Sequence, residues 1–288
     1  MVRTNRERLV MQSVMGKIHH PTVQASGALK ITHDGKHFIS PSVGGITYNV
    51  KVGDSVYAFD CDHVEPGVSI RNEDRGENAA LCALSCIGNE AIVVSGEGKG
   101  TKGIVTGFHG GIEHTIIYFK EKDLQKLLPN DQILIKAFGQ GLKLLDAPSI
   151  ICMGIDPDLL DKMDASVKDN KLTIKVAKKI PSHLMGAGNG MGMGFDGDWD
   201  LMTADRQELE KYGLQDLRYG DIVLMEDCDN TYGRGFFKGA VSVGIVVHSD
   251  SVLTGHGPGV STLFSSREPI IQGEICEKAN LADILNLK

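Results

Sequence analysis

GDSVYAFDCD at residues 53–62 and GDIVLMEDCD at residues 220–229 are identical at six of ten positions, without a gap. The Gly-Asp pair favours a tight turn, because glycine adopts backbone conformations closed to other residues and aspartate bonds its own turn backbone. The valine that follows opens a strand. A weaker copy, NDQILIKA at residues 130–137, keeps the turn and the strand but lacks the terminal acids. Such turn–strand units are typical of small barrels and sandwiches, and they predict either an internal duplication or repeated use of one turn.

The rest of the chain is dominated by short apolar runs bounded by Gly, Asp, Asn or Pro, which predict further strands. We therefore expect an α+β, strand-rich fold of two lobes, built on small barrel-like or sandwich-like β units with few short helices. A stretch rich in proline and charge at 147–181 predicts the boundary, which gives an N-terminal lobe at 1–150 and a C-terminal lobe at 151–288. Strands are predicted at 45–50, 56–59, 91–94, 103–107, 115–119, 133–137, 172–176, 222–225, 240–248 and 251–254, and helices at 77–87, 123–128, 156–163, 204–212 and 281–287.

The composition is that of an ordinary globular protein, with 288 residues, 41% apolar and 23% charged. The net charge of −7 repels polyanions, so we expect neither nucleic acid nor a membrane as a partner. The first sixteen residues contain no apolar stretch typical of a secretory signal, and no run approaches 18 apolar residues. Six cysteines without a C-x-x-C pair indicate thiols in a reducing compartment. These features predict a cytoplasmic protein.

Acidic side chains end both copies of the repeat. Alternation along a strand would place Asp60 and Asp62 on one face, and Asp227 and Asp229 likewise. If the two units pack about a pseudo-twofold axis, these carboxylates and the imidazole of His63 converge. Carboxylate and imidazole suit zinc, manganese or magnesium, which can activate a water. We predict Asp62, His63, Asp227 and Asp229 as ligands of a divalent metal ion; in the alternative interpretation these acids cap turns and face solvent.

A second repeat is shorter. HVEPGVS at residues 63–69 resembles HGPGVS at residues 256–261, with one residue fewer between histidine and proline. We predict the histidines of the two segments, His63 and His256, as catalytic acid–base groups. The second segment follows an apolar strand that ends at His248, which could lie near His256; a satisfied polar or surface role is the alternative for each histidine.

The residues around His256 also predict a substrate site. Its flanking glycines, Gly257 and Gly259, would let a ligand approach the backbone, whose amides can hold an anion. Arg234 is a candidate clamp for a carboxylate or phosphate, with Tyr232 beside it. These four residues are the predicted substrate-binding set.

Two glycine-rich segments give weaker signals. Residues 96–103 lack the spacing of a phosphate-binding loop, and His109 and His114 beyond them fit no metal-ligand spacing. Residues 192–197 spell G-x-G-x-x-G, but no strand-to-helix context surrounds them, so we expect no nucleotide cofactor. Asp196, Asp198 and Asp200 follow in alternation and predict a glycine-rich lid with a cation-binding acidic end, or else an ordinary solvated loop.

Two long stretches carry a family resemblance: residues 44–70, which include DHVEPG, and residues 216–263, which include GHGPG. In them the chain resembles an uncharacterised bacterial family known only as a domain of unknown function. The resemblance runs nearly end to end and implies no activity. The Gly-Asp strand starts also show a remote likeness to acetamidase and formamidase hydrolases, too generic to carry residues across.

Two functions follow from these features. The first is a metal-assisted hydrolase that acts on a small polar or anionic substrate at the seam between the lobes. The alternative is a non-catalytic small-ligand-binding or scaffold protein. We expect a homo-oligomer in either case.

Overall fold

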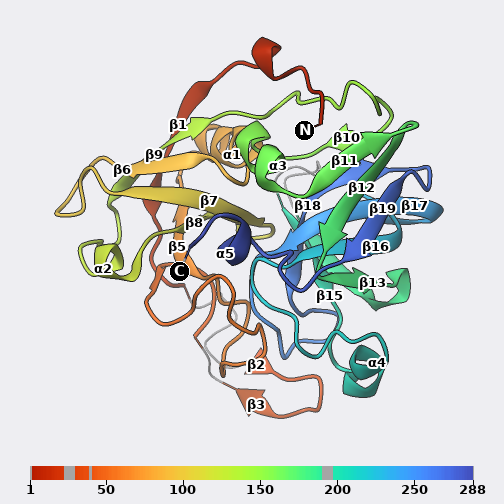
Figure 1. Cartoon of the computed structure of the whole chain (residues 1–288). Helices are drawn as coiled ribbons and strands as arrows, with labels where there is room; N and C mark the ends of the chain where they lie inside the picture. The colour runs from red at the N-terminus through yellow and green to blue at the C-terminus, as the bar shows by residue number, and fades with distance from the viewer. Residues whose placement is uncertain (1, 23–29, 39–40, 190–196, 288) are drawn as a thin grey trace.

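The N-terminal domain is built on a closed barrel of six strands (Figure 1). The computed structural model describes residues 2–22, 30–38, 41–189 and 197–287. The barrel closes because β1 pairs with β9 on one side and with β5 on the other. In sheet order its strands are β1 (Gln12–Ile18), β9 (Gln132–Ala137), β6 (Glu90–Val93), β7 (Lys102–His109), β8 (His114–Tyr118) and β5 (Gly67–Arg71), and β4 (Ile46–Thr47) pairs with β5.

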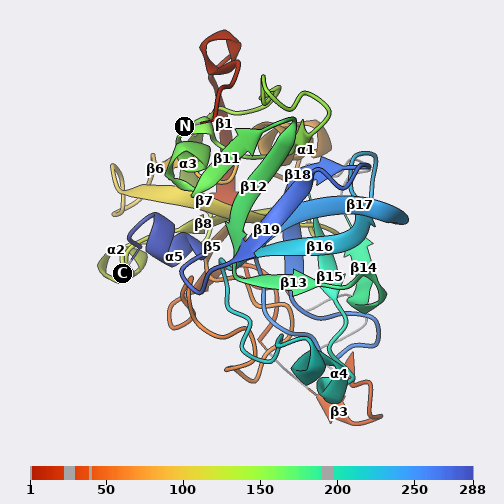
Figure 2. The same cartoon turned by 45° about the vertical axis from the view of Figure 1, so that its right-hand side comes forward.

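The C-terminal domain is built on an open, mainly antiparallel sheet (Figure 2). Its longest strand, β17, is the second arm of a hairpin with β16 and also pairs with β18. In order the strands are β13 (Lys178–Ile180), β16 (Ile222–Asp229), β17 (Gly235–Val246), β18 (Gly259–Ser266), β15 (Asp198–Leu201) and β14 (Met185–Asn189), and β10 (Ile151–Cys152) also pairs with β18.

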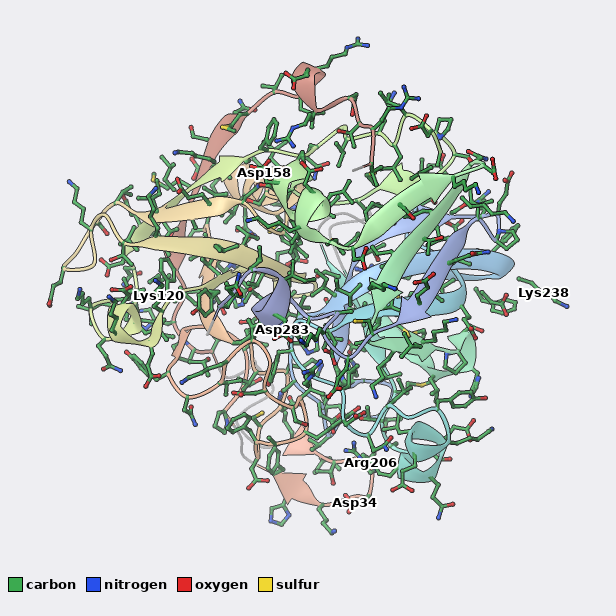
Figure 3. The ribbon with its side chains drawn as sticks, viewed as in Figure 1. Asp34, Lys120, Asp158, Arg206, Lys238 and Asp283 are labelled. Atoms are coloured by element: carbon green, nitrogen blue, oxygen red, sulfur yellow. The ribbon has the colours of Figure 1, made fainter. Side chains whose placement is uncertain are left out.

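Smaller elements complete the molecule. The helices are short because their apolar stretches are short, and their starts follow capping rules: Asp156 accepts a hydrogen bond from the Asp158 amide, with Pro157 at the first helical position. Figure 3 shows Asp34 of the β2–β3 hairpin and Arg206 of α4 at the same edge of the molecule. These elements are β2 (Lys30–Ile31), β3 (His37–Phe38), β11 (Ala165–Lys168), β12 (Lys171–Val176), β19 (Ile271–Ile275), α1 (Arg75–Leu84), α2 (Glu121–Leu124), α3 (Pro157–Lys162), α4 (Arg206–Lys211) and α5 (Leu281–Ile284), with two turns of 3-10 helix at Arg6–Arg8 and Ser182–Leu184.

The strand-rich, two-domain fold with few short helices confirms the predicted fold class. The two copies of the ten-residue repeat, however, do not share one structure. Residues 220–229 turn into strand β16, whereas residues 53–62 form successive turns, so the strand predicted at 56–59 is wrong. The physical reason is that Val56 makes its backbone hydrogen bonds with distant segments: its amide donates to the Leu217 carbonyl, and its carbonyl accepts from the Asp250 amide. The strand predicted at 251–254 is also a turn.

One segment of the N-terminal domain is built into the core of the C-terminal domain. Val50, Val56, Cys61 and Val64 are buried in an apolar cluster whose remaining buried members come from residues 180–260, including Trp199 and Tyr219. Backbone hydrogen bonds fix the same crossing, for example from the Ser249 amide to the Val64 carbonyl. This crossing carries the chain from the barrel to the second sheet and back to β5, and it delivers His63 to the seam between the two domains.

The cysteines form no disulfide in the structure. All six are free thiols, and burial raises the pKa of Cys152 to about 12. In the part of the chain that the structure describes, no helix combines the length and the apolar character that a membrane crossing requires.

Candidate metal centre

A polar cavity of about 220 Å³ lies at the seam between the barrel and the second sheet. His109 enters from the end of β7, and Asp198 and Asp200 enter from β15. His63 comes from the crossing segment, and His256 comes from the loop before β18. The remaining lining residues are Lys30, Ser42, Val43, Gly110, Gly111, Ile112, Ala187, Gly188 and Leu253.

Each of three buried or nearly buried histidines contacts an acceptor oxygen through its Nδ1 atom. His63 Nδ1 lies 3.1 Å from Asp62 Oδ1, and His109 Nδ1 lies 2.6 Å from Glu65 Oε1. His248 Nδ1 lies 2.9 Å from the Ser249 carbonyl oxygen, which can only accept, so this nitrogen donates. A carboxylate or carbonyl on one ring nitrogen fixes the ring and leaves the lone pair on Nε2. The contacts at Nδ1 therefore fix the orientation of the three rings.

The Nε2 atoms of His248 and His63 face the two aspartates of β15. His248 Nε2 lies 2.7 Å from Asp198 Oδ2 and 3.4 Å from Asp200 Oδ1. His63 Nε2 lies 3.6 Å from Asp200 Oδ2. The ring of His109 stacks on that of His248 with 4.2 Å between centroids. Two overlapping groups have ligand atoms within 4.8 Å of one another: His63, Asp200 and His248, and His109, Asp198 and His248.

Local structure explains how β15 and β18 create this arrangement. Alternation along β15 puts Asp198 and Asp200 on one face, and Asp200 pairs with Gly259 of β18. A Cβ at Gly259 would lie 2.0 Å from Asp198 Oδ2 and 2.2 Å from His248 Nε2. Only glycine leaves room for this contact, so Gly259 is required by the cluster itself.

Behind the cavity, two further carboxylates are buried. Asp62 forms an ion pair with Lys30 and accepts a hydrogen bond from Ser251 Oγ at 2.7 Å. Glu65 accepts from the Gly44 amide and contacts His114 Nδ1 at 2.9 Å. These partners fill the lone pairs of both acids, so each carboxylate can hold its histidine in place.

The charges of the cluster are strongly coupled. Burial alone would lower the pKa of His248, but the charge of Asp198 and hydrogen bonds to both aspartates raise it well above its ordinary value. Burial likewise would raise the pKa of Asp200, but hydrogen bonds to His248, His256 and His63 hold it well below its ordinary value. The pKa of His109 is lowered, by burial first and then by the charge of His248, which favours a neutral ring with a free lone pair. A divalent cation could replace the shared protons of such a cluster.

Several residues predicted from the sequence do meet here. His63 Nε2 lies 3.2 Å from His256 Nδ1. The HVEPGVS and HGPGVS segments that carry these histidines share a structural feature: in each, the glycine after the proline begins a buried strand, β5 or β18. Asp62 lies behind His63. Arg234 donates from Nε to the Asp198 carbonyl oxygen and packs against Gly188, at the edge of the cavity.

Other predicted residues lie elsewhere. Asp229 bonds Arg267 Nε at 2.6 Å and lies 3.4 Å from Ser265 Oγ. Ser265 is six residues along β18 from Gly259, which at about 3.3 Å per residue corresponds to roughly 20 Å. Asp227 accepts a hydrogen bond from the Gly239 amide at 2.6 Å. The structure thus does not bring these two acids to His63, because the first copy of the repeat is not a strand and no twofold relation exists between the copies.

The remaining predicted residues have local roles or none. Tyr232 is 81% exposed beside Arg267, and Asp60 is exposed. Gly257 packs on strand β15, where a Cβ would lie 1.8 Å from the Leu201 carbonyl oxygen. Asp196 and the glycine-rich segment at 190–196 lie outside the described residues.

Sequence reasoning missed the supporting residues. Glu65 lies inside the HVEPGVS segment, so its place in the shared motif was a usable signal. Lys30 and His19 carried none. His19 Nδ1 lies 2.9 Å from His114 Nε2, a contact between residues 95 positions apart.

Comparisons with known proteins agree with the fold and are silent on the chemistry. Family models described as "Domain of unknown function (DUF4438), N-terminal" and its C-terminal counterpart match residues 29–161 and 162–285. The crystal structure of TM1086 is 48% identical, with a TM-score of 0.93 and 98% of each chain covered. No curated protein matches the chain. The likeness to acetamidases is not among these findings.

Proposed function

We propose that the cluster binds a divalent metal ion, and that the protein uses this ion to hydrolyse a small polar or anionic substrate. The chain belongs to the DUF4438 family, a domain of unknown function, so the proposal is drawn from the site alone. The observation that carries the proposal is a set of three histidines whose Nδ1 atoms contact buried acceptors. The Nε2 atoms of His63 and His248 point toward Asp198 and Asp200, and His109 has a ligand atom within 4.8 Å of those of Asp198 and His248. Ligating histidines have this outer support as a rule.

The donor set favours zinc or manganese. Imidazole and carboxylate donors suit both metals, and the absence of a cysteine among the residues of the two groups argues against softer ions. His248 belongs to both groups, so it is the central ligand. With His109 and Asp198 it surrounds a position at the buried end of the cavity, where an ion would be shielded from bulk water.

The cavity limits the substrate. A volume of about 220 Å³ lies below the roughly 300–1,000 Å³ of pockets for drug-sized ligands, so it suits a small molecule. Lys30 lines the same cavity. Its ammonium is paired with Asp62, but it has three N–H donors and so can also donate to a polar or anionic group there. These features support a small polar or anionic substrate.

The proposed reaction adds water across one bond of the substrate. A metal ion lowers the pKa of its bound water and so supplies hydroxide near neutral pH. In the net reaction, the oxygen of the water and one of its protons would be added to the electrophilic carbon or phosphorus. The bond to the leaving group would break with its electron pair going to that group, which would take the other proton of the water.

Metal analysis of tag-free protein tests the proposal. We expect the wild-type chain to contain stoichiometric zinc or manganese by mass spectrometry, and His248→Ala to contain less than a tenth of that amount. His183→Ala is the matched control, because His183 is a half-exposed surface histidine paired with Glu208.

Metal-loaded protein is then assayed against small esters, amides and phosphate esters, with the chelated form as the blank. Protein without stoichiometric metal, or a His248→Ala variant with full metal content, would contradict the metal site. Bound metal without turnover of any substrate would favour the non-catalytic ligand-binding alternative.

A further inference from the structure

The carboxylate of Asp200 faces two different sets of donors with its two oxygens. Oδ1 lies 3.4 Å from His248 Nε2, and Oδ2 lies 2.7 Å from His256 Nδ1. The side chain is 7% exposed, so this division is fixed by the surrounding protein and not by solvent. A carboxylate in this position can bridge two cations.

The donors around Oδ2 form a triangle of the size that one ion requires. His63 Nε2 lies 3.2 Å from His256 Nδ1 and 3.6 Å from Asp200 Oδ2, and the third side is 2.7 Å. With metal–ligand distances of about 2.0–2.2 Å, two donors on one tetrahedral ion lie about 3.3 Å apart. The three observed donor–donor distances, 2.7, 3.2 and 3.6 Å, lie around this value, so one ion could bind all three donors after small shifts.

The donors around Oδ1 form the second set. His248 Nε2 lies 2.7 Å from Asp198 Oδ2, and His109 stacks on His248. Asp198 Oδ1 is occupied by the Gly110 amide at 2.7 Å, which leaves Oδ2 as its ligand atom. Because a single imidazole nitrogen binds one ion, His248 belongs to this set, and His63 and His256 complete the other.

We infer that the cavity holds two divalent ions bridged by Asp200: a buried ion at His248, His109 and Asp198, and an outer ion at His63 and His256. The inference rests on the proposed function and deepens it. The outer ion is more accessible, since the His256 side chain is 34% exposed, whereas His248 is fully buried. In two-ion sites the ions lie about 3.5–4 Å apart and stabilise both the attacking and the leaving oxygen of a displacement.

Counting the ions tests the inference. Chelated, tag-free protein is titrated with Mn²⁺ and followed by calorimetry and electron paramagnetic resonance. We expect two ions per chain and an exchange-coupled manganese spectrum. His256→Ala should bind one ion with an uncoupled six-line spectrum and retain the wild-type melting profile of the metal-free form, because the side chain is partly exposed. His183→Ala should still bind two.

The outcomes separate the two proposals. One ion in the wild-type chain, or two ions without exchange coupling, overturns the bridged pair and leaves the single-ion hydrolase standing. No ion overturns both. A His256→Ala chain that still binds two coupled ions also overturns the inference, since His256 would then not be a ligand. His256→Gln provides a second substitution that keeps the size of the side chain while removing the imidazole.

Discussion

Two acidic regions of the C-terminal domain look alike in sequence and differ in the partners that surround their carboxylates. Asp198 and Asp200 line the cavity at the seam and meet histidines from three other segments. Asp227 and Asp229 lie at the β16–β17 hairpin, where they bond a backbone amide and an arginine whose side chain is 57% exposed. Lys238, from the same hairpin, projects away from the body of the molecule (Figure 3).

The difference shows what turns acidic residues into a candidate site. The hairpin acids are satisfied by partners within about forty residues of the chain, as turn and edge acids commonly are. Apart from the Gly110 amide on Asp198, the described partners of the cavity acids are histidines, and His63 and His248 are themselves held by further acceptors. Such a set is expensive to bury without a ligand, because every charge must find a partner in a medium of low dielectric.

The largest difference should be in stability, between Asp62 and Asp229, the matching terminal acids of the repeat. Asp62→Ala leaves the Lys30 ammonium, 11% exposed, without its partner, and should lower the free energy of unfolding by about 3–5 kcal/mol. Asp229→Ala breaks a pair with a half-exposed arginine and should cost about 1 kcal/mol or less. Urea denaturation of both variants in metal-free buffer measures the difference.

A double variant provides the control for that prediction. Replacement of both members of the pair, Lys30→Met with Asp62→Leu, removes the uncompensated charge and should recover part of the loss. Equal destabilisation by Asp62→Ala and Asp229→Ala would mean that Asp62 is no better buried than its hairpin counterpart.

An intermediate effect is expected from two glycines that begin neighbouring strands. Gly259→Ala drives a methyl group into Asp198 and His248 and should cost about 1–3 kcal/mol and abolish binding at the buried ion position. Gly235→Ala meets no atom closer than 3.9 Å and should leave both stability and metal content within error. Melting curves and metal analysis check both; retention of the metal by Gly259→Ala would contradict the placement of His248 against β18.

The smallest effect concerns pH. Burial would raise the pKa of Asp229, but hydrogen bonds from Thr231 and Arg267 hold it below its ordinary value. A depressed folded-state pKa stabilises the protein above the unfolded value of about 3.9, and this contribution is lost as the pH falls through the folded value. The difference in unfolding free energy between wild type and Asp229→Asn should thus be constant from about pH 5 to 7 and shrink below about pH 4. A difference that grows on acidification would reverse the sign of the shift.

The fold class was predictable because it depends on local patterns. Alternation in β9, with every second residue buried, and the cap at Asp156 are both visible in the sequence. The ten-residue repeat misled because turn chemistry at Gly-Asp is local, whereas the fate of the next residues depends on partners. The backbone hydrogen-bond partners of Val56 are Leu217 and Asp250, more than 150 residues away, and no local sequence pattern predicts them.

The candidate site was predictable in part for the same reason. His63 and His256 were found because their segments repeat a histidine followed by Pro-Gly at a strand start. His109 and His248 carried weak signals, since a histidine at the end of a strand is more often structural. Glu65 and Lys30 act only through their neighbours in space, so their roles appear when the crossing segment is folded into place.

The crossing of residues 50–64 into the second core has a consequence for how this protein can be divided. A fragment ending at residue 161, where the first family model ends, would leave Val50, Val56 and Val64 without the apolar surface that covers them. The complementary fragment would lack part of its own interior, together with His63. We therefore expect neither half to fold by itself, and we expect the seam that holds the cluster to form only when both halves are present.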